Sequence, residues 1–206
     1  MKNESFSPAQ RSGRGEATRS RVIAVAKAAF AKHGYTGVSL SEIVRRADVT
    51  TGAIYYHFKD KKGLFQAVAE TLEQEIMDYV AALPPHDDPW GTFIDGVGAT
   101  LEICAREDIN RIVFKEAPSV IGPAEWREIE AQYAFGMMQA AISGLADAGI
   151  VDAPDPDVTS QIILGAIIEA AQAVASAPVT EVALKDARSA VLKMVTALRK
   201  SDAVSE

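Results

Sequence analysis

Cysteine is almost absent from this chain of 206 residues, in which Cys104 is the only one. A single cysteine excludes an intramolecular disulfide, and with it the small secreted proteins that disulfides stabilise. The sequence also lacks an apolar run of transmembrane length, and its start lacks a basic-then-apolar signal sequence. We therefore expect a cytoplasmic protein that is not embedded in a membrane.

Proline is lacking inside every segment that has helical periodicity. An interior proline costs a helix about 3 kcal/mol, so the prolines indicate where helices end. All nine lie in the N-terminal tail or between periodic segments, at Pro8, Pro84, Pro85, Pro89, Pro118, Pro123, Pro154, Pro156 and Pro178. Long or moderately long helices are expected at 18–33, 60–83, 89–105, 108–117, 123–148, 156–176 and 180–200. With two shorter helices described below, the pattern predicts an all-α chain of about nine helices, and no stretch shows the two-residue alternation of a strand.

Recognisable catalytic and cofactor motifs are also lacking. The three histidines, His33, His57 and His86, lie far apart in the sequence, and none has another ligand at metal-binding spacing. The stretch Gly96-Val97-Gly98 lacks the third glycine of a dinucleotide-binding loop, and no serine has the context of a nucleophile elbow. Dispersed catalytic residues would leave no motif, but nothing in the sequence supports an enzyme, a cofactor or a metal.

Negative charge is scarce in the first third of the chain. Residues 1–65 hold 12 Lys and Arg against 5 Asp and Glu, whereas residues 66–206 hold 9 against 23, and the whole chain has a net charge of −7. A basic end on an acidic body is expected when that end meets phosphates. The acidic body would repel DNA and orient the protein on it.

Two short helices are predicted between residues 39 and 58. Ser39 and Glu42 form a capping box at the start of the first helix. Its apolar residues recur at helical spacing, at Leu40, Ile43, Val44 and Ala47. Thr50 or Thr51 can cap the second helix, which ends near Phe58. Two short helices joined by a tight turn form a helix-turn-helix unit.

The outward face of the second short helix is suited to a duplex. It offers hydroxyls, a bare backbone and an imidazole from Thr50, Thr51, Gly52, Tyr56 and His57, and Lys59, Lys61 and Lys62 follow. Small residues at a helix N-terminus allow close approach to DNA, while Tyr, His and Lys donate to phosphate oxygens. The alternative is a helical hairpin whose polar residues merely face water.

At these residues the sequence resembles a known family. The run TTGAIYYHFKDKKGLF is similar to the recognition-helix signature of TetR-family transcriptional repressors, and TRSRVIAVAKAAFAKHGYTGVSLSEIVRRADV is similar to the two helices before it. The resemblance covers roughly residues 18 to 66. Asp48 stands where the family commonly has glycine, but aspartate tolerates the left-handed conformation. Gly63 stands where the family usually has an acidic residue, at a cost of roughly 1 kcal/mol in helix propensity.

The resemblance implies a ligand-responsive repressor that binds a pseudo-palindromic operator on double-stranded DNA as a homodimer and is released by a small apolar effector. It assigns base edges or the groove floor to Thr50, Thr51, Gly52 and Tyr55, phosphates to Ser39, Tyr56, His57 and Lys61, and further backbone contacts to Arg45 and Arg46. The direction of Tyr55 stays open, because its ring can equally pack inward.

The last two helices favour self-association through residues 156–200. Residues 158–175 are apolar on nearly every side, and a helix apolar on every side must be buried on every side. Packing against a symmetry mate in a four-helix bundle achieves this simply, and the resemblance implies the same homodimer. The alternative is a central helix of the monomer core.

The resemblance also implies that the larger domain binds the unknown effector. Residues that fill space and often line cavities are candidates: Trp90, Phe93, Cys104, Phe114, Trp126, Tyr133, Met137, Ile163, Ile167 and Glu169. Such residues more often form plain core. Glu169 stands out because it lies inside an apolar helix, where a carboxylate should be paired, protonated or at a cavity.

These observations predict three regions. Residues 1–17 form a disordered basic tail, residues 18–65 a helix-turn-helix DNA-binding domain, and residues 66–206 a helical ligand-binding and dimerisation domain. Two other classes of protein remain as alternatives, a helical small-molecule-binding protein without DNA recognition and an all-α enzyme.

Overall fold

A computed structural model describes residues 8–200, and most of this part of the chain is helical. The strand-like structure among these residues is limited to one isolated antiparallel β-bridge between Val151 and Arg199. The prediction of an all-α chain is therefore confirmed. The chain divides into two compact units, Met1–Glu70 and Thr71–Glu206, called here the N-terminal and the C-terminal unit.

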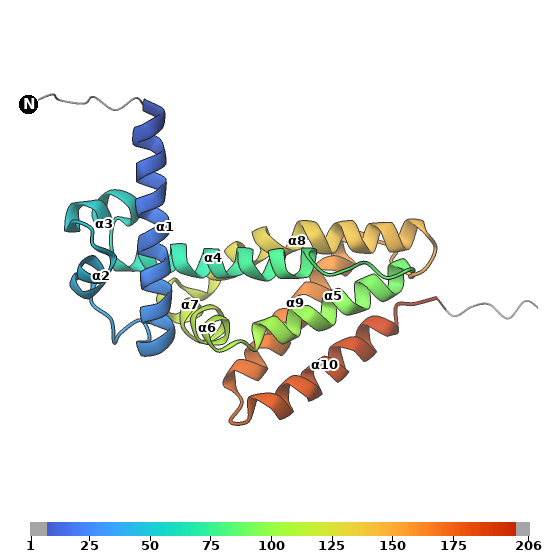
Figure 1. Ribbon diagram of the computed structural model, residues 1–206. Helices are drawn as coiled ribbons and strands as arrows, with labels where there is room; N and C mark the ends of the chain where they lie inside the picture. The colour runs from blue at the N-terminus through green and yellow to red at the C-terminus, as the bar shows by residue number, and fades with distance from the viewer. Residues whose placement is uncertain (1–7, 201–206) are drawn as a thin grey trace, which may run out of the picture. The chain divides into compact units, whose positions relative to one another are not determined.

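The N-terminal unit contains α1 (Pro8–His33), α2 (Leu40–Ala47), α3 (Thr51–Phe58) and the first half of α4 (Lys61–Ala81) (Figure 1). Each helix turns an apolar stripe inward. The rings of Phe30 and Phe65 meet edge to face with centroids 5.2 Å apart, and Tyr35 packs against Phe65 at 5.1 Å. Ile43 and Ile54 are fully buried, so α2 and α3 are fixed to this core.

Helix α1 begins at Pro8, so the predicted start at Thr18 and the predicted disorder up to residue 17 are wrong for residues 8–17. Proline suits the first turn of a helix, where its missing N–H is not needed. Extending a helix that packing has already nucleated adds one hydrogen bond per residue without a new nucleation cost. Residues 1–7 of the predicted tail lie outside the described residues.

Local hydrogen bonds define the ends of α2 and α3. The Ser39 hydroxyl accepts from the N–H of Glu42, and the Thr50 hydroxyl accepts from the N–H of Ala53, each at 3.2 Å. Of the two threonines that the sequence allowed as the cap of α3, Thr50 has this role. Asp48 ends α2 in the left-handed conformation, with φ 49° and ψ 56°, as expected for the turn.

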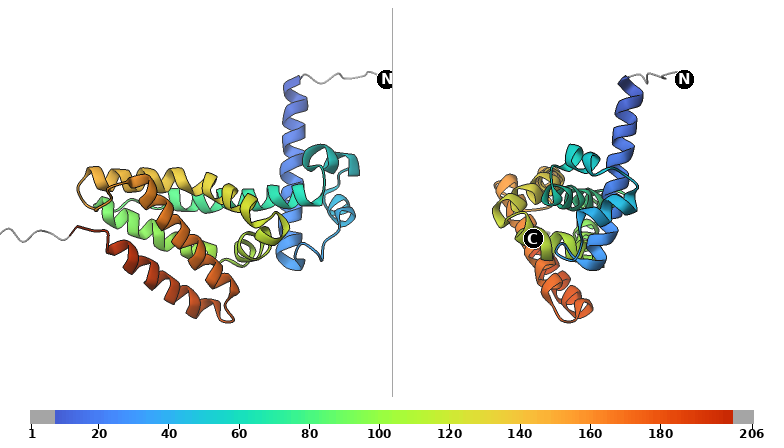
Figure 2. Two further views of the ribbon diagram at one scale, coloured as in Figure 1. Left: turned by 180° about the vertical axis from the view of Figure 1, so that it is seen from behind. Right: turned by 90° about the vertical axis from the view of Figure 1, so that its left-hand side faces the viewer.

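The C-terminal unit contains the rest of α4 and seven further helical segments. These are α5 (Pro89–Cys104), α6 (Glu107–Ile109), the π-helix η1 (Asn110–Glu116), α7 (Ala117–Val120), α8 (Pro123–Asp147), α9 (Pro156–Ser176) and α10 (Thr180–Thr196). Helices α9 and α10 form an antiparallel pair, and both views in Figure 2 show them side by side. The core joins residues of α5, α8, α9 and α10, among them Val97, Leu101, Ile142, Ile163 and Val195.

Residues 107–120 form one helical stretch made of α6, η1 and α7. Counted as one helix, it confirms the predicted number of about nine helices for residues 8–200. Pro118 does not end this stretch, although the sequence predicted a helix over 108–117. The π-helix before it changes the hydrogen-bonding register, so Pro118 lies in the first turn of α7, where no N–H is required.

Helix α10 ends at Thr196, four residues before the predicted end. The following residues pair with the segment after α8 instead. The N–H of Asp152 donates to the Leu198 carbonyl at 2.8 Å, and the N–H of Lys200 donates to the Ile150 carbonyl at 2.9 Å. The N–H of Lys200 thus bonds outside the helix, while the N–H groups of Leu198 and Arg199 donate to Val195 and Thr196 in a tighter turn.

Helix α9 is long and apolar enough, by length and composition alone, to cross a membrane, which the sequence analysis did not expect. Isoleucine, leucine, valine and alanine side chains give this helix its high mean hydropathy. One side is buried within the protomer, including Ile163, Ile167 and Val174, and the other side exposes Val158 and Ile162. The core helix of a soluble protein has the same composition.

The left-handed conformation of Asp48 yields a stability prediction. We expect Asp48→Gly to leave unfolding in urea unchanged or to raise its free energy by up to about 1 kcal/mol, because glycine has no Cβ to clash. Asp48→Val should lower it by about 1–2 kcal/mol, since a β-branched residue strongly disfavours this conformation. Asp48→Asn is the matched control and should behave like the wild type. Equal stability of the Val and Asn variants would contradict the assignment.

Candidate nucleic-acid interface and ligand cavity

Helix α3 presents its polar face to solvent. Thr50, Thr51 and Gly52 are exposed, and the side chains of Tyr55 and Tyr56 are 55% and 84% exposed. Ile54 and Phe58 face inward and are buried, which fixes the rotation of the helix. The ring of Tyr55 therefore points outward, which the sequence left open.

The residues predicted to contact phosphates lie around this face and differ in their exposure and in their side-chain contacts. Ser39, Arg45 and Arg46 are exposed, and Arg46 pairs with Glu42 at 3.3 Å. His57 is half-buried and meets the Tyr56 ring at a centroid distance of 4.9 Å. Lys61 is also half-buried, with its Nζ 4.3 Å from the centroid of the Tyr35 ring. We had not predicted this cation–π contact, because the two residues are far apart in the sequence.

Gly52 is not required by the packing of the chain. A Cβ built at this position would come no closer to another atom than 3.8 Å, from the Thr50 hydroxyl, which is an ordinary contact. The bare backbone at the start of α3 is therefore available to something outside the protomer. Gly63 differs, because a Cβ there would collide with the carbonyl oxygen of Phe58.

The junction between α3 and α4 explains this collision. Lys59 has φ 67° and ψ −52°, and the N–H of Asp60 donates to the Phe58 carbonyl at 2.8 Å. This is a γ-turn with positive φ, a rare and strained conformation for a residue with a side chain. It turns the Phe58 carbonyl toward α4. The Asp60 carboxylate then caps α4 by accepting from the N–H of Gly63 at 2.7 Å.

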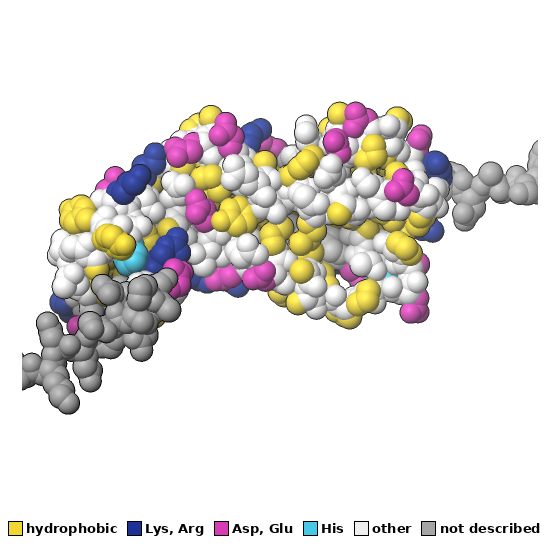
Figure 3. Space-filling model, turned by 90° about the horizontal axis from the view of Figure 1, so that it is seen from above, with side chains coloured by type: hydrophobic (Ala, Val, Ile, Leu, Met, Phe, Trp, Pro, Cys, Tyr) yellow, Lys and Arg dark blue, Asp and Glu magenta, His cyan; other side chains and the backbone are white. Residues whose placement is uncertain are grey.

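The C-terminal unit contains a partly open cavity of about 850 Å³ among α4, α5, α8 and α9. Figure 3 shows hydrophobic side chains gathered where this unit is hollowed. The lining is mainly apolar, with a few polar groups at the 85–89 loop and on α5. It consists of Met77, Val80, Ala81, Leu83, Pro85, His86, Asp87, Pro89, Thr92, Phe93, Gly96, Val97, Thr100, Ala134, Met137, Met138, Ala140, Ala141, Gly144, Leu145, Leu164 and Ile167.

Three of the ten candidate ligand residues line this cavity, namely Phe93, Met137 and Ile167. The other seven lie elsewhere: Trp90, Cys104, Phe114, Trp126, Tyr133, Ile163 and Glu169. We missed the contributions of α4 and of the small residues on α8. The spacing of Ala134, Ala141 and Gly144 on one face of α8 is a signal that could have identified the wall, since small residues leave space between helices.

Glu169 is exposed, and its carboxylate lies 3.5 Å from the Arg127 guanidinium. The buried carboxylates are instead those of Glu73 on α4 and Glu130 on α8, which are 5% and 4% exposed. Burial, together with the charge of Glu130, raises the pKa of Glu73 to about 8. Burial also raises the pKa of Glu130 to about 7.

Two polar atoms near Glu130 lack hydrogen-bonding partners. The Trp126 indole N–H is close enough to favour the charged form of Glu130 and oppose the rise in its pKa. It is not in hydrogen-bonding geometry, however, and Trp126 Nε1 and Glu130 Oε1 are both buried without a partner. Cys104 is buried in the same region, and burial followed by the charges of Glu73 and Glu130 raises the pKa of its thiol.

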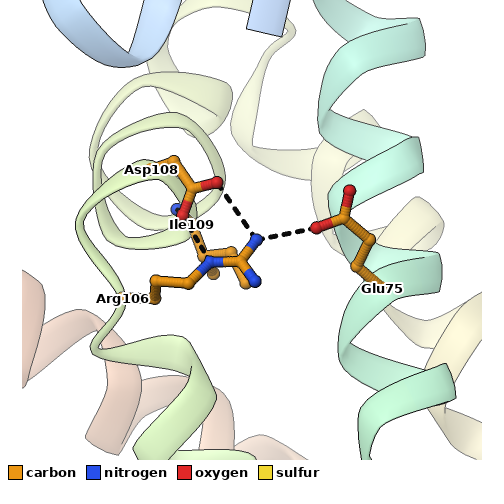
Figure 4. A network of polar contacts seen from close by, with 4 residues as sticks. All are labelled: Glu75, Arg106, Asp108 and Ile109. Atoms are coloured by element: carbon orange, nitrogen blue, oxygen red, sulfur yellow. Dashed lines mark hydrogen bonds and ion pairs between the residues drawn. The ribbon is translucent and has the colours of Figure 1, made fainter. Parts of the chain in front are cut away.

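A polar network connects α4 to the stretch that contains the π-helix (Figure 4). The guanidinium of Arg106 donates to Asp108 through Nε at 2.6 Å and through Nη2 at 3.0 Å. Nη2 also donates to Glu75 at 2.7 Å. The bonds to Asp108, and then those to Glu75, raise the pKa of Arg106 against the opposing effect of burial. The bidentate pairing with Asp108 holds the guanidinium in place, and its further bond to Glu75 links the start of the 107–120 stretch to α4.

Both units match models of known families. Residues 22–68 match a model described as bacterial regulatory proteins of the tetR family, and residues 90–198 match one described as a tetracyclin repressor-like C-terminal domain.

Individual relatives and a solved structure agree. The Transposon Tn10 TetC protein of Escherichia coli is 29% identical over 150 residues, which are 73% of this chain and 76% of the relative. The HTH-type transcriptional repressor SCO4008 of Streptomyces coelicolor is 31% identical over 147 residues, covering 69% of this chain and 73% of the relative. The crystal structure of a TetR-family transcriptional regulator from Pectobacterium atrosepticum superposes with a TM-score of 0.83 at 29% identity, covering 95% of this chain and 99% of that one.

The buried carboxylates predict a pH-dependent stability. Both pKa values are higher in the folded chain than the ordinary value of 4.5. The folded state therefore binds more protons than the unfolded state above about pH 4.5, and the free energy of unfolding should fall as the pH rises to about 8. Glu73→Gln should flatten this dependence and raise the free energy of unfolding at pH 8 by about 2 kcal/mol or more.

Urea unfolding at several pH values measures this effect. Glu128→Gln, which changes an exposed carboxylate on the same helix as Glu130, is the control and should keep the wild-type slope. A Glu73→Gln variant with that same slope would show that Glu73 does not bind the extra proton.

Proposed function

The chain belongs to the TetR family of transcriptional regulators, and we propose that it is a homodimeric, cytoplasmic repressor that a small effector releases from its operator. The observation that carries this proposal is the exposed polar face of α3, anchored by the buried Ile54 and Phe58 on a basic unit. A regulator of this family binds DNA through its helix-turn-helix.

We propose residue-level roles for this face. Thr50, Thr51 and Gly52 approach base edges, because they form the exposed start of α3, and Tyr55 joins them one turn further along the exposed side of the helix. Phosphates are contacted by Ser39, Tyr56, His57 and Lys61, and Arg45 and Arg46 make further contacts to the DNA backbone. The free space at Gly52 supports this assignment, since a duplex can press against the helix where no side chain intervenes.

A homodimer would place two copies of α3 on one duplex. The outer sides of α9 and α10 support self-association, because they expose large apolar side chains that the protomer does not cover: Val158, Ile162, Val179, Val182 and Met194. Gly165 follows Ile162 by about one turn of α9, and a Cβ built at this position has no atom within 4 Å, so a partner helix can approach closely. Two-fold symmetry then predicts half-sites about one helical turn apart or a multiple of it.

The cavity of the C-terminal unit is the proposed effector site. Its volume of about 850 Å³ is within the range of drug-sized ligand sites, and its lining is mainly apolar. Release from DNA requires that the effector binds one conformation of the protein better than another. Helix α4 lines the cavity through Met77 and also carries Lys61, so it is the element through which we propose that effector binding acts.

Substitution of Tyr56 tests the DNA contact. We expect Tyr56→Ala to weaken operator binding by about 1–3 kcal/mol, and Lys61→Ala to lower the slope of log affinity against log salt by about 1. Fluorescence anisotropy with a duplex selected from genomic fragments, across a salt series, measures both. Tyr79→Ala, at an exposed tyrosine of the C-terminal unit, is the control and should bind like the wild type. Failure to select any duplex would favour a helical ligand-binding protein without DNA recognition.

Substitution of Ile162 tests the dimer. Ile162→Asp places a charge on the exposed apolar side of α9, and we expect the dimer dissociation constant to rise at least about 100-fold, because two charges would be buried at the symmetric contact. Sedimentation equilibrium measures the constant. Tyr79→Asp, on α4, should leave it unchanged. A dimer that resists Ile162→Asp would place the interface outside α9.

A further inference from the structure

Buried ionisable side chains lie just beyond one end of the cavity. Three helices each carry one of them, one turn beyond the last residue of that helix that lines the cavity. The pairs are Met77 and Glu73 on α4, Thr100 and Cys104 on α5, and Ala134 and Glu130 on α8. Helices α4 and α8 run in one direction and α5 runs in the other (Figure 1), so all three steps lead the same way. The cluster is therefore about one helical pitch, about 5.4 Å, from the apolar lining.

The two carboxylates of this cluster interact with each other across the helices. The charge of Glu130 disfavours ionisation of Glu73, and both carboxylates disfavour ionisation of the Cys104 thiol. Burial raises the pKa of both carboxyl groups, and the charge of Glu130 opposes ionisation of Glu73, so the two do not both ionise readily near neutral pH.

Neither carboxylate has a cation as its partner in the described part of the chain. Arg127 and Glu169 are the other charged groups that act on Glu130, but both are exposed and paired with each other. Glu130 is only 4% exposed, and its Oε1 atom accepts no hydrogen bond. A buried carboxylate oxygen without a donor costs free energy, which a cationic donor would offset.

We propose that the cavity takes an amphipathic organic cation, whose ammonium group binds between Glu73 and Glu130 and whose apolar body fills the lined space. This inference rests on the proposed effector function of the cavity. Because the carboxylates lie one helical turn beyond the cavity lining, the nitrogen of the ligand should be on a short alkyl arm, about 5.4 Å beyond its apolar body. Met77, at the entrance to the cluster, is unbranched and can change rotamer at low cost.

Other ligand classes fit the same residues less well. An anion would be repelled by the carboxylate pair, and a neutral apolar compound would leave Glu130 Oε1 without a donor. A metal ion lacks ligands, because no group of three or more His, Cys, Asp or Glu suited to a metal occurs among the residues described. A monovalent ammonium group favours the ionised form of a buried carboxyl group and offers it N–H donors.

The experiment compares phenylbutylamine with phenylbutanol, which have the same apolar body and differ in charge. Isothermal titration calorimetry at pH 7.5 should give an affinity for the amine at least about tenfold higher than for the alcohol. Glu130→Gln keeps the shape of the side chain and removes its charge, and it should abolish this preference while the affinity for the alcohol stays within about twofold. Glu169→Gln, at the exposed carboxylate, should retain the preference.

Titration in two buffers of different ionisation enthalpy supplies a second measurement. Binding of the amine should release a fraction of a proton in the wild type, because the ammonium group favours the ionised carboxyl groups, and the release should be smaller in Glu73→Gln and Glu130→Gln. Equal affinities for amine and alcohol, or a preference that survives Glu130→Gln, would overturn the cation proposal and leave the effector cavity standing. If neither probe bound, the effector cavity and the cation proposal would both fail, while operator binding, measured separately, would still decide the DNA-binding role.

Discussion

One helix contributes to the cores of both units, and the rest of the structure depends on this constraint. The first half of α4 buries Leu64 and Phe65 in the N-terminal unit, where Phe65 packs against Phe30. The second half buries Leu72 and Ile76 in the C-terminal unit. The same helix lines the cavity, carries the buried Glu73 and receives the Arg106 network at Glu75. A change in its position therefore has to be accommodated by two cores, one cavity and one polar network.

The features that the sequence predicted well are those set by neighbours along the chain. The caps at Ser39 and Thr50 depend on hydrogen bonds spanning three residues, and the left-handed Asp48 depends on its own backbone. The apolar stripes of α1 and α2 follow from helical periodicity alone. For the same reason the exposed residues of α3 could be identified in advance, because Ile54 and Phe58 fix its rotation once it is helical.

The features that were missed depend on contacts between distant segments. Glu169 has apolar neighbours in the sequence but lies on the exposed side of α9. Glu73 and Glu130 lie in stretches that contain other charged and amide side chains, yet tertiary packing buries them. Most of the aromatic candidates, including Trp90 and Trp126, fill the core rather than the cavity. The cavity wall is made by small residues such as Ala134 and Gly144, which leave space only because of the helices opposite them. Sequence periodicity identifies a buried side but not which part of it is packed.

The strained turn at Lys59 has a consequence for how the sequence of this region can vary. Its γ-turn directs the Phe58 carbonyl at the position that a Cβ of residue 63 would occupy. Glycine at 63 and positive φ at 59 are therefore coupled, although neither residue touches the other. In a chain with an acidic residue at 63, its Cβ would push the Phe58 carbonyl away, and the turn between α3 and α4 would change its conformation. Residue 59 would then no longer have to adopt a positive φ. The two positions should thus vary together among closely related chains, as a pair linked through one peptide carbonyl and not through their side chains.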